Sequence, residues 1–153
     1  MDDIRAEDMP AVMGDWARRL EGESLEESLR ECVEIVQDGF EDNFGRQVDS
    51  HGVPWPPRKD SKPHPLLNET GALIGATQEG GLGNITIIAD RHFTTGIDKQ
   101  ADAGGIRGAA VHNFGHDFGD FTVPQREYLY ATEAVLESCG EVIADAATGW
   151  FLY

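Results

Sequence analysis

The sequence predicts an α+β fold, in which helices at both ends of the chain pack against a small antiparallel sheet. Two long segments, residues 25–44 and 132–150, repeat apolar side chains at the spacing of an amphipathic helix. Between them, residues 84–89 and 92–97 form two short runs rich in Ile and Thr, separated by two polar residues. That pattern is typical of a β-hairpin. The length of 153 residues fits a single domain over residues 1–153.

The charge of the chain excludes several function classes. There are 28 acidic and 12 basic residues, which gives a net charge of -16. Such a surface is repelled by duplex DNA and by anionic membranes, so we expect neither as a bound partner. Apolar runs stay well below the roughly 18 residues of a membrane span. The acidic start of the chain argues against a secretory signal, and Cys32 and Cys139 are expected to be buried free thiols.

The first half of the chain is predicted to be mostly helical. Residues 1–23 are expected to form an N-terminal helical segment. A capping-box pattern at Ser24 then opens the helix over residues 25–44, with acids opposite its apolar stripe. Gly45 is expected to end it in a left-handed cap. The stripe consists of Leu25, Leu29, Cys32, Val33, Val36, Phe40 and Phe44.

The middle of the chain is predicted to be irregular. Residues 46–65 contain five prolines, which remove backbone donors and favour extended geometry, so we expect a long loop there. Trp55 in this loop would either anchor a contact with another protein or fold back onto its own core. A short helix is expected over Leu66 to Thr77, and a mobile glycine-containing loop over residues 99–108.

The last third of the chain is predicted to contain a short helical or extended piece, then a strand, and then the final helix. Ala109 to Phe114 would be a short helical or extended piece, and Phe121 to Val123 a strand that Pro124 ends. In the final helix one apolar side faces the core. That side consists of Val135, Leu136, Cys139, Val142, Ile143, Ala146 and Trp150.

One motif has the spacing of a metal site. His112 and His116 stand four residues apart, with Asp117 following, so both imidazoles would face one ion if the segment were helical. Gly115 between them makes a regular helix doubtful. His51, His64 and His92 have no obvious partners, and the acidic neighbours of Cys32 disfavour a reactive thiolate. We therefore expect no catalytic residue, no metal and no cofactor.

Two ordered groups of residues resemble a known family, the phage virion morphogenesis proteins that complete the tails of Mu-like and P2-like phages. The first is Gly52-Val53-Pro54-Trp55-Pro56-Pro57-Arg58 followed by Pro65-Leu66-Leu67-Asn68-Glu69-Thr70-Gly71-Ala72-Leu73; the second is Ala110-Val111-His112-Asn113-Phe114-Gly115 followed by Val123-Pro124-Gln125-Arg126-Glu127-Tyr128-Leu129. The resemblance covers roughly residues 25–150. Glu127 and Tyr128 depart from it, because the family often has Pro and Phe there.

This resemblance implies a structural role at the head–tail junction of a virion. The chain would complete or terminate the tail as the subunit of a ring homo-oligomer, expected to be a hexamer. Its partners would be further copies, the tail tube and neck or connector proteins, with DNA passing through unbound. It would reside in the host cytoplasm during assembly. The residues implied as interface or structural positions are Trp55, Pro56, Pro57, Leu67, Thr70, Gly71, Leu73, His112, Phe114, Gly115, Pro124, Arg126 and Tyr128.

Local roles can be assigned to some of these positions. Arg126 is expected to pair with a carboxylate or carbonyl at the start of the last helix, and Thr70-Gly71 to form a turn or cap. His112, Phe114 and Gly115 are expected to pack the sheet against a helix. Three other functions stay open: a head-side neck or stopper protein, a metal-dependent hydrolase that uses His112 and His116, and an acidic mimic of DNA charge that blocks a host protein.

Overall fold

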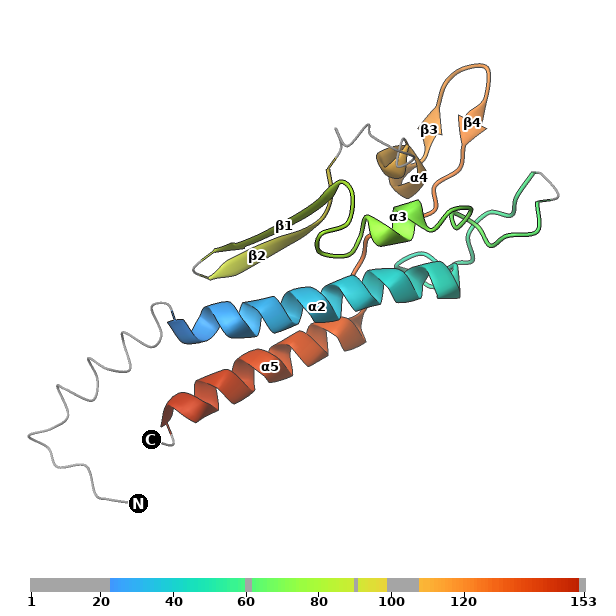
Figure 1. Ribbon diagram of the computed structural model, residues 1–153. Coiled ribbons are helices and arrows are strands. Elements are labelled where there is room, and N and C mark those ends of the chain that lie inside the picture. The colour runs from blue at the N-terminus through green and yellow to red at the C-terminus, as the bar shows by residue number, and fades with distance from the viewer. Residues whose placement is uncertain (1–22, 60–61, 90, 99–107, 152–153) are drawn as a thin grey trace, which may run out of the picture.

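The computed structural model describes residues 23–59, 62–89, 91–98 and 108–151. It confirms an α+β fold with a small antiparallel sheet, drawn in Figure 1. The expected N-terminal helix and most of the expected 99–108 loop lie outside these residues. The elements are α2 (Glu23–Arg46), α3 (Ala72–Gly75), β1 (Asn84–Ala89), β2 (His92–Ile97), α4 (Ala109–Phe114), β3 (His116–Asp117), β4 (Thr122–Val123) and α5 (Glu133–Phe151).

Helix α2 is the central layer of the fold, and its predicted apolar stripe is buried from Leu29 to Phe44. The expected end at Gly45 is wrong, because the helix continues to Arg46 and Gln47 takes the left-handed conformation, with φ of 53°. This geometry turns the carbonyl of Gln47 toward Trp55, whose backbone N–H donates to it at 2.8 Å. A bond to a distant residue therefore offsets the strain of a left-handed glutamine.

Helix α5 runs beside α2 along one side of it (Figure 1). The two helices approach closely at Gly39, where a Cβ atom would lie only 2.8 Å from a methyl carbon of Val135. The cysteines face each other across the same seam: Sγ of Cys32 lies 3.6 Å from the carbonyl oxygen of Cys139, and neither forms a disulfide. Leu136 does not share the buried side as expected, since 59% of it is exposed.

The predicted hairpin is confirmed as β1 and β2, paired antiparallel from Asn84 opposite Ile97 to Ala89 opposite His92. It covers the side of α2 away from α5 (Figure 1). Its contact with the helix is partly polar, because Nε2 of Gln37 donates to the hydroxyls of Thr86 at 3.0 Å and Thr95 at 2.8 Å. These bonds satisfy an amide that is nearly fully buried.

The helix expected over Leu66 to Thr77 is largely absent, and only the single turn α3 forms. Two residues interrupt the helical path: Leu67 has φ of 59° and Gly71 has φ of 74°. Gly71 instead stands at the N-cap of α3, and the N–H of Ala72 donates to Thr70 Oγ1 at 3.3 Å. Thr70-Gly71 thus makes the turn predicted for it.

The described residues between α2 and α3 contain no helix or strand, apart from an isolated bridge between Val48 and Pro54. Further along, α4 leads into β3, which pairs with β4 in a second hairpin that projects from the body (Figure 1). The predicted strand over Phe121 to Val123 is confirmed at Thr122 and Val123. Among the described helices, none is both long and apolar enough to cross a membrane.

Candidate functional site

Three aromatic rings form the core beneath the candidate site. Trp55 packs edge-on to Phe44 with ring centres 6.1 Å apart, and Phe44 contacts Tyr128 at 4.9 Å. Nε1 of Trp55 donates to the carbonyl of Glu127 at 3.0 Å, and the residue is only 5% exposed. Of the two positions open to it, Trp55 therefore takes the one in its own core.

Arg126 fastens the proline-containing segment onto this core. Its Nε donates to the carbonyl of Pro56 at 3.2 Å, and one terminal nitrogen donates to that of Pro57 at 3.4 Å. The prediction that Arg126 pairs at the start of the last helix is thus wrong in its location. Its partners are carbonyls, one of the two kinds of acceptor predicted. The reason is the path of the chain: Arg126 N donates to His112 O at 2.7 Å, which directs the buried side chain toward the proline segment.

A pocket of about 560 Å³ opens next to Arg126, and we call it the basic pocket. Among the described residues that line it, four are Lys or Arg and one is a carboxylate, a basic balance that is unusual in a chain with 12 basic and 28 acidic residues. Leucines 66, 67 and 73 supply an apolar wall, so the predicted Leu67 and Leu73 both belong to it. The charged and imidazole lining residues are Arg58, Lys59, Lys62, His64, Glu69, His112 and Arg126.

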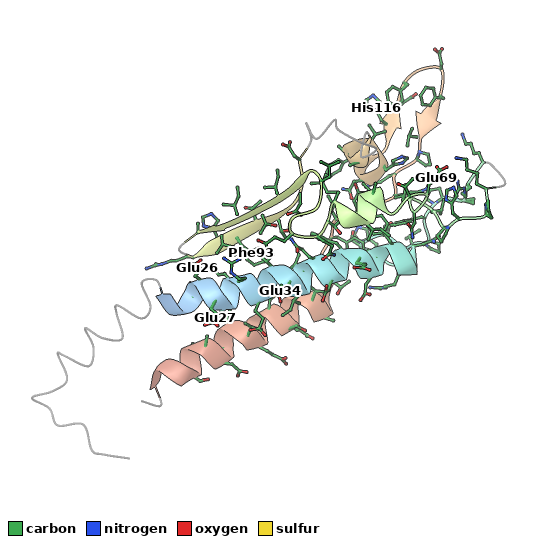
Figure 2. All side chains as sticks on the ribbon, viewed as in Figure 1. Glu26, Glu27, Glu34, Glu69, Phe93 and His116 are labelled. Carbon is green, nitrogen blue, oxygen red and sulfur yellow. The ribbon has the colours of Figure 1, made fainter. Side chains whose placement is uncertain are left out.

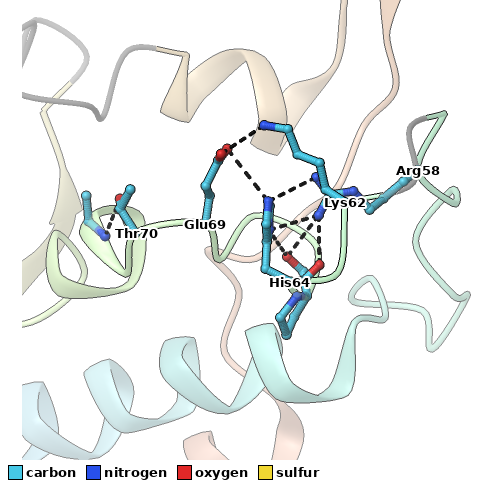
Figure 3. Close-up of polar contacts among 7 residues, drawn as sticks. Arg58, Lys62, His64, Glu69 and Thr70 are labelled. Carbon is cyan, nitrogen blue, oxygen red and sulfur yellow. Dashed lines mark hydrogen bonds and ion pairs between the residues drawn. The ribbon is translucent and has the colours of Figure 1, made fainter.

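A polar network holds one side of the basic pocket in place, as Figure 3 shows. Nη1 of Arg58 donates to the carbonyl of His64 at 2.8 Å and lies 2.9 Å from its Nδ1. Lys62 donates to Glu69 at 2.8 Å, which lowers the pKa of that carboxyl, and His64 lies 3.8 Å from the same residue. His64, which has no obvious partner in the sequence, therefore has two.

The other side of the pocket is crowded with positive charge. Burial lowers the pKa of Arg126, and the nearby charge of Arg58 lowers it further. Burial also lowers the pKa of His112, with the charge of Arg126 as the second cause. Burial and a cationic neighbour thus disfavour the charged form of each group. An anion bound in the pocket would stabilise the charged forms.

The second feature is an aromatic cluster on the β3–β4 hairpin, which we call the aromatic hairpin (residues 116–123). The rings of Phe118 and Phe121 stack with centres 4.8 Å apart, and His116, labelled in Figure 2, contacts Phe118 edge-on at 4.4 Å. Phe118 is 49% exposed and Phe121 is 59% exposed. The turn is held because Asp117 Oδ1 accepts from Gly119 N at 2.9 Å.

Phe114 is the last residue of α4 and lies two residues before the aromatic hairpin. Its exposure contradicts another prediction. The sequence predicts that Phe114 packs the sheet against a helix, but the residue is 67% exposed. The reason is its position on α4, whose buried residues are Ala109 and Asn113, because Phe114 lies about 100° or more away from both around the helix. Gly115 lies close to Gln125, because a Cβ would stand 3.0 Å from the backbone nitrogen there.

The candidate metal motif is not assembled. His112 is in α4, whereas His116 and Asp117 are in the exposed strand β3, so the two imidazoles do not share one helix face. Gly115 breaks the helix between them. Within the described ranges, no group of three His, Cys, Asp or Glu side chains is arranged to hold a metal ion.

Sequence reasoning missed both main features of the site. Phe118 and Phe121 flank Gly119 and Asp120, two residues typical of a turn, and this pattern indicates a hairpin at that point. The basic pocket joins residues near position 60 to residues near position 120, and no local pattern links them. Comparisons of this chain with known protein families, curated proteins and solved structures match none of them.

Proposed function

We propose that the chain is a structural subunit of a phage particle, which completes or terminates the tail at the head–tail junction as part of a homo-oligomeric ring. The observation that carries this proposal is the aromatic hairpin. It presents two stacked, half-exposed phenylalanines and the neighbouring Phe114 on an element that projects from the body. Contiguous exposed apolar side chains of this kind mark protein–protein contacts.

The hairpin has the properties of a docking element. Its turn is fixed by Asp117, and Phe118 N donates to Phe121 O at 3.0 Å, so its rings are ordered before a partner arrives. Pre-ordering lowers the entropy lost on association. Covering the exposed halves of Phe118 and Phe121 would contribute roughly 2–3 kcal/mol of binding free energy. That is a useful share of a subunit contact.

The resemblance to the virion morphogenesis family supports the assignment of this docking element to a tail. The two motif groups also meet in space, because Arg126 of the second group binds the carbonyls of Pro56 and Pro57 of the first. The order of motifs along the chain thus corresponds to one structural unit. A head-side neck protein would use the same kind of subunit contact. The position of the chain in the particle, at the tail end or against the head, distinguishes the two roles.

The test uses a cognate phage that lacks the gene, with its tails and filled heads mixed with purified protein. The wild-type chain should restore joined, infectious particles, and cryo-EM should place it at the tail end. The double variant Phe118→Ser/Phe121→Ser should fold normally and restore joining poorly. Leu136→Ser is the matched control, because it removes an apolar residue that is 59% exposed on another face. Infectious particles formed equally well without the chain would refute the proposal.

A further inference from the structure

We propose that the basic pocket receives the acidic face of helix α2 from a second copy of this chain, so that neighbouring ring subunits contact each other head to tail. The inference rests on the proposed ring-forming function and names the contact that builds the ring. It is carried by two charged surfaces of opposite sign, one on α2 and the other around α3 and α4.

The first surface is the acidic face of α2. It consists of Glu27, Glu31, Glu34, Asp38, Glu41 and Asp42, all exposed. At 3.6 residues per turn these six residues lie opposite the buried stripe of Leu29, Val33, Val36 and Phe40. Figure 2 labels two of them, Glu27 and Glu34. Counting only pairs between described residues, none of the six forms an ion pair.

This face carries an electrostatic cost in the isolated subunit. Glu27 and Glu31, like Glu34 and Asp38, stand four residues apart, where equal charges destabilise a helix by roughly 0.2–0.5 kcal/mol per pair. A cationic partner would convert this repulsion into attraction. The acidic face is thus a surface that gains from being covered.

The second surface, the basic pocket, is its complement. With Arg58, Lys59, Lys62 and Arg126 against Glu69, the lining carries a surplus of positive charge. The leucine wall can cover the methylene groups of incoming glutamates, while Lys59 and Lys62 are exposed at the rim. A row of carboxylates on a helix fits this combination of cations and apolar wall.

The arrangement of the two surfaces determines the kind of assembly. The pocket is lined by residues of α3, α4, the segment before α3 and the segment after β4. Figure 1 draws α3 and α4 on the side of α2 away from α5. A contact between two different surfaces of identical chains is heterologous, and it generates a ring when the rotation closes. In such a ring each copy covers the acidic face of its neighbour. Nucleic acid bound in the pocket would instead leave the repulsion among the carboxylates of every acidic face unchanged.

The experiment compares two charge-reversal variants in the full-length chain. Lys59→Glu/Lys62→Glu reverses the rim of the pocket, and Glu34→Lys/Asp38→Lys reverses the acidic face. Each variant alone should raise the dissociation constant of self-association by roughly tenfold or more, measured by sedimentation velocity. An equimolar mixture should assemble again, because alternating copies pair each reversed pocket with a reversed acidic face.

Glu133→Lys/Glu137→Lys is the matched control, because it makes the same charge change at exposed positions on α5 and should leave assembly unchanged. Wild-type assembly should weaken from low to high salt, a readout that needs no variant. If the wild type assembles and both reversals assemble equally well, the inference fails while the proposed function stands. A wild type that never self-associates, alone or on tails, overturns both. Loss of binding to a DNA oligonucleotide in Lys59→Glu/Lys62→Glu, with self-association unchanged, assigns the pocket to nucleic acid.

Discussion

Asn43 and Tyr128 are joined by a buried hydrogen bond: Nδ2 of Asn43 donates to the carbonyl oxygen of Tyr128 at 2.9 Å. The same nitrogen donates to the carbonyl of Tyr130 at 2.9 Å. On its other side, the N–H of Tyr128 donates to Oδ1 of Asn113 at 3.0 Å. Tyr128 is therefore held between α2 and α4. Because Arg126 and the aromatic hairpin precede it directly, these bonds position the candidate site.

Replacing Asn43 with alanine should destabilise the whole protein. The change leaves the buried carbonyl of Tyr128 and the partly buried carbonyl of Tyr130 without their donor, which costs about 2–3 kcal/mol in the free energy of unfolding. Urea denaturation followed by circular dichroism measures it. Glu41→Ala, an exposed neighbour on the same helix, should change the free energy by less than about 0.5 kcal/mol. Equal midpoints for the two variants would show that the Asn43 bonds do not hold the segment.

The thiol of Cys32 should be unreactive in the folded protein. Burial raises its pKa to about 11, with smaller contributions from Cys139 and Glu31. At pH 8 its thiolate fraction is then roughly a hundredfold lower than that of a thiol with the ordinary value. An aromatic disulfide reagent should label Cys139 first and Cys32 only after unfolding, with Cys139→Ala and Cys32→Ala assigning the two phases. Fast labelling of Cys32 in the native Cys139→Ala variant would contradict its burial.

The same shift has a defined effect on stability. The folded pKa lies above the unfolded one, so the contribution of Cys32 is complete below pH 9 and is lost as the pH rises toward 11. The Cys32→Ala variant lacks this group. Its stability should decline less than that of the wild type over this interval.

Much of the fold follows from local patterns in the sequence. The apolar repeat of α2 and α5 and the two runs of β1 and β2 are periodic over enough residues to be predicted. The end of α2 cannot be predicted in this way. Gln47 takes a left-handed conformation there, and a hydrogen bond from Trp55, eight residues later, stabilises it. Helix α3 is short for a similar reason, since Leu67 leaves the helical region within an otherwise helix-compatible run.

The candidate site was less predictable than the fold. Asp117-Phe118-Gly119-Asp120-Phe121 contains a turn signal, but strand β3 has only two residues, too few for an alternating pattern. The basic pocket depends on Arg58 and Arg126 lying close together, and the tertiary path alone produces that proximity. The sequence points to Arg126 as a structural position, but its carbonyl partners lie about 70 residues away along the chain, so no local pattern identifies them.

His112 should make the protein less stable in mild acid. Burial and the charge of Arg126 lower its pKa in the folded state below the ordinary value of 6.5. As the pH falls below 6.5, the unfolded chain therefore binds a proton that the folded chain resists, and the free energy of unfolding decreases. His112→Gln cannot take up that proton, so it should flatten the decline between pH 7.5 and 5.5 in urea denaturation.

The comparison between wild type and His112→Gln isolates this imidazole, because other groups that titrate in the interval are common to both proteins. His92→Gln is a suitable control, since His92 is exposed on β2. It should leave the pH dependence of stability as it is in the wild type. A parallel decline in the wild type and His112→Gln would mean that His112 is not the group responsible.

Gly115 should tolerate a side chain much less well than Gly119. Both glycines have positive φ, 71° and 85°, so alanine is strained at either position, by about 1 kcal/mol. At Gly115 the added Cβ would also lie 3.0 Å from Gln125 N, whereas at Gly119 it meets nothing within 4 Å. The extra contact separates α4 from the segment that carries Arg126. Gly115→Ala should therefore lower the free energy of unfolding by roughly 2–3 kcal/mol, and Gly119→Ala by about 1 kcal/mol. Thermal and urea denaturation of the two variants measure this difference, and equal losses would show that the close approach at Gly115 is not needed for the fold.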